Sequence, residues 1–459
     1  MNRLFAWVTN YLYLFNSIIM LFFVLNHFIS NDYFAYTIGV LTVLLFLISF
    51  PGSSKLFKIL SSSFIVLGTA SFIYSGLSLK EIPELITSNI PILTLLLVLP
   101  LMTGVVQAGR YDRRLNEIIK GNVKTLGELY VRSSLTTFAL STFLNISALS
   151  LSQEVLVKNM KEVEQKIKNS FISQATLKGL ALALVWSPME IIVALTVDAT
   201  GISYLSYLPY LILCAVFMIT LDGLLGRKRF GPVSYESAAA SEVGSLSLNR
   251  LFKPIIKLFF SFATFLGLVV SIGALLDINF ILSVSLIIPP FVFIWAKLLK
   301  RWRSFKMIGL KIWKERANRM QNFIVLFVSL AFFSNSLSKT SFHTIINQLF
   351  LTLSDHPLLI LLCIQFFILL MGLVGIHAIA TIGILLEVVI PLYSIINPLS
   401  IGIVIITGAL ATLTVGAYGV TVTMTSITTK QNPYRITLQN MPFALTFGFT
   451  GVIIGFLLS

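Results

Sequence analysis

An apolar run with a polar centre limits the folds open to this chain more than any other feature of its sequence. Residues 357–393 are apolar almost throughout, yet their centre reads LVGIHAIATIGILL and contains Gly375 and His377. Residues 126–152 have the same character, with Asn145 at their centre. Non-helical backbone at the depth of a bilayer is stable only where protein or a water-filled cavity satisfies its polar groups. The two runs therefore predict paired re-entrant hairpins with a substrate site between their tips.

The composition excludes a soluble globular protein. The chain has 459 residues, of which 56% are hydrophobic and 11% charged, a balance typical of a polytopic membrane protein. The net charge of +15 does not indicate a nucleic-acid partner, because the basic residues fall in short loops between apolar runs. Cys214 and Cys363 both lie inside apolar runs, where neither a disulfide nor a metal pair is expected.

Apolar runs of about 20 residues, enough to cross a bilayer, predict an all-α integral membrane protein. We expect about 11 transmembrane helices plus two re-entrant hairpins. With the N-terminus in the cytoplasm and both hairpins returning to the side from which they start, nearly all of the 33 Lys and Arg lie in cytoplasmic loops, as the positive-inside rule requires. The prediction is a multi-pass protein of the cell (plasma) membrane with its C-terminus outside.

The first half of the chain, residues 1–225, is predicted to be the first of two repeats. It holds an extra first helix, the hairpin at 126–152 and a helix at 177–197 that is broken at a Trp-Ser-Pro sequence. Apolar residues at helical spacing over 154–168 predict a helix lying on the membrane surface. A polar stretch at 226–250 reads as a cytoplasmic linker.

The second repeat is predicted at 251–459, with its hairpin at 357–393 and a helix at 399–425 broken at Gly-Ala-Tyr-Gly. Because the first hairpin would start from inside and the second from outside, the halves have opposite orientation. Such an inverted repeat is the architecture of many secondary transporters.

The spacing of the polar tips and the helix breaks agrees between the halves. Trp186 follows Asn145 by 41 positions, and Gly416 follows Gly375 by 41 positions. Each half thus carries a polar tip followed at equal distance by a break, although the agreement can also arise by chance.

This plan resembles the ion transporter superfamily, which includes arsenite, citrate, dicarboxylate and sodium/proton carriers. The dicarboxylate carriers have Ser-Asn-Thr at both tips, whereas this chain has Asn-Ile-Ser at 145–147 and Gly-Ile-His at 375–377. The resemblance therefore covers the architecture and not the motifs. It implies a homodimer, a scaffold made of the early helices of each half, and a transport unit that moves as a body.

Side-chain oxygens and freed carbonyls near the tips and breaks are the candidate ligands for a substrate or for Na⁺. Half-helix N-termini would attract an anion, and the glycines of the second break would bring the backbone close to a substrate. The alternative is that these hydroxyl and amide groups only bond between helices. The candidate substrate- or ion-binding residues are Asn145, Ser147, Ser187, His377, Thr381, Gly416 and Tyr418.

Ionisable residues at membrane depth are functional candidates by default. His377 titrates in a range that suits a proton relay, or it is a neutral ring bonded to a carbonyl. Glu190 and Glu387 are deep acids that could carry a proton or pair structurally. Arg132 is either a counter-charge for an anionic substrate or a local partner of Glu128, four residues earlier.

The sequence contains no phosphate-binding loop, metal-ligand cluster or nucleophile–base spacing. We therefore expect neither an enzyme nor a metal site, and no cofactor beyond Na⁺ or H⁺ as a coupling ion. The predicted function is secondary active transport of a small anion or organic acid by an elevator-like alternating-access cycle. The alternatives are a flippase for lipid or lipid phosphate, an accessory protein of the cell envelope in contact with membrane lipids, and a degenerate repeat that serves as a scaffold.

Overall fold

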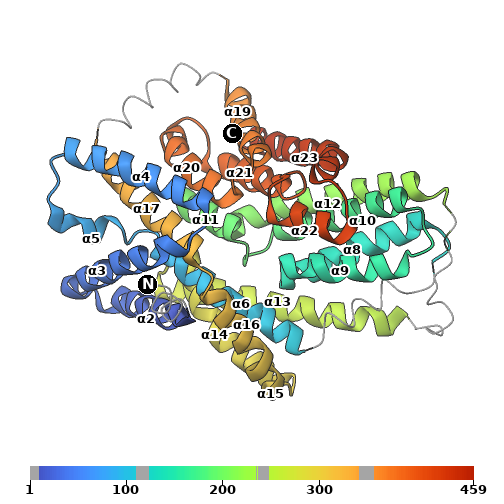
Figure 1. The fold of residues 1–459 in the computed structure, drawn as a ribbon, viewed down its shortest axis with the longest axis horizontal. Coiled ribbons are helices and arrows are strands. Elements are labelled where there is room, and N and C mark those ends of the chain that lie inside the picture. Colours follow the sequence, from blue (N-terminus) through green and yellow to red (C-terminus); the bar gives the residue numbers. More distant parts are fainter. Residues whose placement is uncertain (1–9, 110–122, 234, 236–247, 341–355) are drawn as a thin grey trace. The chain divides into compact units, whose positions relative to one another are not determined.

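Helices make up the fold throughout the part of the chain that the structure describes. The structure is a computed structural model and describes residues 10–109, 123–233, 235, 248–340 and 356–459, in which no β-strand occurs. Figure 1 shows these helices along the chain. This agrees with the all-α fold class expected from the sequence.

Ten helices within the described ranges are long and apolar enough to cross a membrane. Nine of them overlap the continuous spans predicted from the apolar runs at 5–29, 33–50, 59–79, 85–108, 204–225, 255–276, 280–296, 322–337 and 442–458. The exception is α19 (Pro357–Val374), whose 18 residues were assigned to a hairpin but are long enough to span alone. The two helices predicted to be broken are absent from this set, and their apolar pieces α11 (Ile191–Thr200) and α21 (Pro398–Thr412) are shorter than 18 residues.

The contacts divide the chain into two compact units, and each unit contains segments from both halves. Unit 1 comprises Met1–Ala108, Ile272–Thr352 and Glu387–Pro391. In it, α17 packs along α4, and α14 along α6. Its helices are α2 (Leu12–Ile29), α3 (Asp32–Ser49), α4 (Lys55–Tyr74), α5 (Ile82–Leu85), α6 (Ile90–Ala108), α14 (Phe280–Leu298), α15 (Trp302–Ser304), α16 (Leu310–Ala317) and α17 (Gln321–Ser338), with the short helical turns η1 (Phe50–Gly52), η2 (Leu79–Glu81) and η3 (Phe305–Gly309).

Unit 2 comprises Gly109–Ser271, Leu353–Leu386 and Leu392–Ser459 and contains both tips and both helix breaks. A pair of helices joined at a tip, an interrupted helix and a long helix follow one another twice. The first set is α8 (Leu126–Leu144), α9 (Ile146–Asn159), α10 (Gln165–Leu184), α11 and α12 (Tyr204–Phe230); the second is α19, α20 (Ala378–Val389), α21, α22 (Val420–Thr429) and α23 (Pro433–Phe456). Most of α13 (Leu248–Leu276) and most of α20 belong to unit 2, and the residues of η4 (Ile390–Ser394) are divided between the two units.

The helices that lead into the two tips, α8 and α19, end with different backbone conformations and different capping hydrogen bonds. Asn145 has φ +50° and ψ −135°, and its side-chain oxygen accepts the backbone N–H of Ile146 at 2.7 Å. Gly375 has φ +98°, a conformation that costs a glycine little. The carbonyl of Met371 accepts the N–H of Ile376 at 2.9 Å, which closes the capping turn at the end of α19. α8 and α9 consequently lie against each other (Figure 1).

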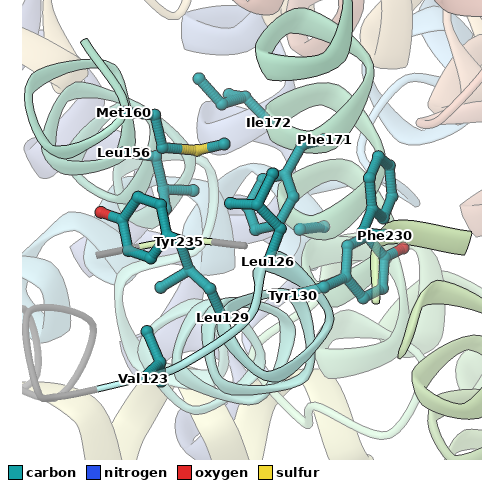
Figure 2. Close-up of a cluster of buried hydrophobic side chains, with 11 residues drawn as sticks. Val123, Leu126, Leu129, Tyr130, Leu156, Met160, Phe171, Ile172, Phe230 and Tyr235 are labelled. Atoms are coloured by element: carbon teal, nitrogen blue, oxygen red, sulfur yellow. The ribbon is translucent and has the colours of Figure 1, made fainter. Parts of the chain in front are cut away.

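A buried apolar cluster packs the start of α8 and the end of α9 against α10 and α12 (Figure 2). The Tyr130 ring stacks on Phe230 of α12 at 5.3 Å and meets Phe171 of α10 edge-on at 5.5 Å. Leu156 and Met160 of the segment predicted to lie on the membrane surface are fully buried in this cluster. That prediction was wrong, since the apolar face packs against protein and α9 ends at Asn159 before α10 begins at Gln165.

Hydrogen bonds within unit 2 tie the two halves of the sequence together. The buried Gln153 amide of α9 donates to Thr176 of α10 at 3.0 Å and to Thr425 of α22 at 2.8 Å. In addition, α11 packs on α21, and α22 packs on both α9 and α10. The two interrupted helices are therefore in direct contact with each other.

Candidate functional site

The first tip is hydrogen-bonded to the first helix break. The Asn145 side-chain nitrogen donates to Oε2 of Glu190 at 2.9 Å. Glu190 lies at the start of α11 and is 6% exposed. The break itself is a tight turn in which the Ser187 carbonyl accepts the N–H of Glu190 at 3.1 Å. The carboxyl group of Glu190 is thus held at the junction of the first tip and the first break.

The second tip lies against the second break through packing. A Cβ on Gly375 would come within 2.9 Å of the Tyr418 ring, and one on Gly372 within 2.7 Å of Thr412. Tyr418 is exposed, and its hydroxyl is hydrogen-bonded to that of Tyr434. A Cβ on Gly416 would lie 3.3 Å from the Gly372 carbonyl oxygen. The glycines here permit close approach of α19 to the break, and no acid corresponds to Glu190.

His377 immediately precedes α20 and makes a local contact with its first turn. Its Nδ1 accepts the backbone N–H of Ile379 at 3.3 Å, and its carbonyl accepts that of Thr381 at 3.0 Å. The Thr381 hydroxyl is buried and has no hydrogen-bond partner in the described part of the chain. Thr381 thus leaves one buried polar atom that a ligand or water could satisfy.

The serine candidates differ in their surroundings. Ser187 is buried, and its hydroxyl oxygen accepts the N–H of Met189 at 3.3 Å, which stabilises the turn before α11. Ser147 is half-buried in the first turn of α9, two residues after the tip. Further down α8, the Ser141 hydroxyl is fully buried and lacks a partner among the described residues.

The carbonyls freed by the breaks are largely occupied by hydroxyl groups. Tyr204 donates to the Trp186 carbonyl at 2.5 Å, and Thr437 donates to the Val415 carbonyl at 2.8 Å. Thr421 likewise donates to the Leu413 carbonyl at 2.5 Å. Each carbonyl keeps a second lone pair, but an ion at either break would have to share these oxygens with a neighbouring side chain.

Two of the ionisable candidates do not join this arrangement. Arg132 is half-buried on α8, and its expected ion pair with Glu128 is not formed within the described residues, where Glu128 instead accepts the N–H of Lys124 at 3.0 Å. The side chain of Glu387 lies outside the described residues. Its role, like a counter-charge role for Arg132, stays a prediction.

A buried charge network on α8, α10 and α12 was not found from the sequence. Lys178 forms an ion pair of 2.7 Å with Asp222, and both side chains are almost fully buried. The Tyr130 hydroxyl contacts both Asp222 carboxylate oxygens, at 2.9 and 3.1 Å. Asp222 could have been singled out as an acid inside an apolar span, but nothing in the sequence identified Lys178 as its partner.

Fold and site together define the class: a multi-pass helical membrane protein whose second unit holds two tips and two interrupted helices in mutual contact. Comparison with protein-family models and with curated proteins finds no match for this sequence.

Solved structures share this fold, and two of them are membrane transporters. One is the YdaH transporter of Alcanivorax borkumensis, with 13% identity, coverage of 86% of this chain and 97% of that chain, and a TM-score of 0.61. The other is MtrF of Neisseria gonorrhoeae, described with a class of antimetabolite efflux pumps, with 11% identity, coverage of 86% and 94%, and a TM-score of 0.58. Neither belongs to the carriers named from the sequence, so the likeness holds for a membrane-transporter fold and not for that superfamily.

Proposed function

We propose that the chain is a secondary active transporter that moves a small anion or organic acid by alternating access, coupled to Na⁺ or H⁺. The observation that carries the proposal is the Asn145–Glu190 hydrogen bond of 2.9 Å, which holds a buried acid at a helix break. Interrupted helices of this kind are where secondary transporters bind substrate and coupling ion. The shared fold with YdaH and MtrF supports the same reading.

In this proposal Glu190 carries the coupling ion. Its carboxylate can take up a proton or ligate Na⁺, and the Asn145 amide orients it. The buried hydroxyls of Ser141 and Thr381, one from each half, supply further oxygens without a partner in the described part of the chain. The N-terminus of α22 has no side-chain cap on its free N–H groups, which favours an anion there.

The division into units supports an elevator-like cycle. Helices α2 to α6 of the first half and α14 to α17 of the second half form unit 1, and the tips and breaks are gathered in unit 2. The hydrogen bonds of Gln153 to α10 and α22 join the two halves of the sequence within unit 2, which supports movement of unit 2 as one body. We infer a scaffold role for unit 1, a homodimer, and a topology with the N-terminus in the cytoplasm and the C-terminus outside.

The test is uptake into proteoliposomes under an imposed Na⁺ or H⁺ gradient, with labelled mono-, di- and tricarboxylates and aromatic carboxylates as solutes. We expect uptake of at least one solute that disappears when the gradient is collapsed. Glu190→Gln keeps an oxygen that accepts the Asn145 amide but removes the charge, so it should make the remaining flux independent of the gradient. Flux that is absent for every solute, or unaffected by the gradient, would reject the proposal.

A further inference from the structure

A groove between α12 and α23 on unit 2 lies away from the tips and breaks. It has a volume of about 180 Å³ and is lined by side chains of α10, α12 and α23. The Lys178–Asp222 ion pair forms part of its lining, and the Phe443 ring lies 5.4 Å from the Lys178 ammonium. The groove therefore combines charged groups with an aromatic face.

The charge of the groove is positive. Lys178 is neutralised by Asp222, whereas Arg229 at the rim has no ion-pair partner within the described residues and donates to Gln174 Oε1 at 3.2 Å. Arg229 is exposed, and Arg227 and Lys228 precede it in the last turn of α12. A guanidinium with several free N–H groups beside further cations is suited to a phosphate.

The surroundings of the groove face an apolar solvent. Leu225 lines the groove and is 59% exposed, and Leu224 beside it is 64% exposed. On α23, Leu438 and Leu445 flank the groove residues and are 71% and 52% exposed. Both helices are long and apolar enough to span a membrane. Exposed leucines on two such helices place the groove on the lipid-facing surface.

From these observations we propose that the groove binds an anionic phospholipid, with the lipid phosphate on Arg229 and the acyl chains along the leucines of α12 and α23. Basic clefts between spanning helices on the cytoplasmic side are sites for acidic headgroups. The buried ion pair below Arg229 supplies polar atoms at headgroup depth without adding net charge. This lipid is bound to the protein and is not its cargo.

The experiment measures lipid bound to the full-length protein in detergent by native mass spectrometry, with phosphatidylglycerol and phosphatidylcholine compared at equal concentration. We expect phosphatidylglycerol to be retained at least tenfold better. Arg229→Gln should abolish the preference, while Lys228→Gln, a neighbouring cation outside the lining, should change it less than twofold. Thr446→Phe fills the groove without altering charge and should also lower retention.

Three results would overturn the proposal. Equal losses in Arg229→Gln and Lys228→Gln would mean a diffuse attraction to the basic helix end. Full retention in Thr446→Phe would place the lipid elsewhere. Displacement of phosphatidylglycerol by millimolar inorganic phosphate or glycerol phosphate would assign the groove to a soluble anion. The measurement involves no transport, so it stands or fails separately from the proposed function.

Discussion

The Asn145 side-chain amide lies 2.9 Å from the Glu190 carboxylate, and the two residues belong to different interruptions of the helical chain. One ends α8 at a tip and the other begins α11 after a break. Movement of the tip away from the break would leave Glu190 without this donor, which links the position of the tip to the charge state of the acid.

Replacing Asn145 by glycine removes the amide but keeps the backbone freedom that φ +50° requires. A hydrogen bond to a charged group contributes about 1.5–3 kcal/mol, so transport should fall about tenfold or more while the protein stays folded. Asn145→Asp preserves the shape but sets a second carboxylate against Glu190 and should be worse than glycine. Wild-type transport rates in Asn145→Gly, measured in proteoliposomes, would remove this bond from the mechanism.

Gly375→Ala should destabilise unit 2 because the new Cβ meets the Tyr418 ring at 2.9 Å and φ +98° disfavours a side chain. We expect backbone strain and overpacking together to lower the free energy of unfolding by about 2–4 kcal/mol. Thermal unfolding in detergent measures it. The double variant with Tyr418→Gly removes both the ring and the Tyr418 Cβ, which lies 3.0 Å from the new methyl group. It should recover the part of the loss that comes from overpacking and leave the part that comes from backbone strain, whereas no recovery would show that the Tyr418 side chain is not what the alanine meets.

Lys178→Met should lower the free energy of unfolding by about 3–5 kcal/mol, because it leaves the buried Asp222 carboxylate without its cationic partner. Adding Asp222→Leu removes the stranded charge and should restore most of the stability, as for buried pairs elsewhere. The exposed Lys311–Glu315 pair is the matched control, and Lys311→Ala should change stability by less than about 1 kcal/mol. Equal effects at both sites would contradict a special role for burial.

Cysteine labelling tests whether the helix pairs return to their starting side. After replacement of the native cysteines, Lys124→Cys and Lys161→Cys should react with a membrane-impermeant thiol reagent only from the cytoplasmic face. His356→Cys and Ser394→Cys should react only from outside. All four positions are exposed. Labelling of Lys124→Cys and Lys161→Cys from opposite faces would mean that the first pair crosses the membrane.

Local backbone chemistry made the helix interruptions predictable. Gly375 and Asn145 tolerate positive φ, and Pro188 and Gly416 disfavour a continuous helix, so each break could be located from its own residues. Periodicity over 154–168 correctly predicted an apolar face, but it could not tell whether protein or lipid covers that face.

Contacts between residues far apart in the chain could not be predicted from the sequence. Lys178 and Asp222 are 44 positions apart on two helices, and nothing local couples a lysine after a polar stretch to an acid in an apolar one. The role of α19 could not be predicted from its sequence either. Its 18 apolar residues suit both a helix that crosses the membrane and one arm of a re-entrant hairpin, and only the neighbouring helices distinguish the two.

The Gln153–Thr425 hydrogen bond has a consequence for biogenesis, because 272 positions separate its two residues. At a synthesis rate of about 5–20 residues per second, Thr425 leaves the ribosome roughly 14–54 seconds after Gln153. During that interval the Gln153 amide is already in the membrane without one of its final acceptors. Assembly of unit 2 therefore waits for the last helices of the chain, and a nascent protein truncated before α22 would be a natural client for quality control in the bilayer.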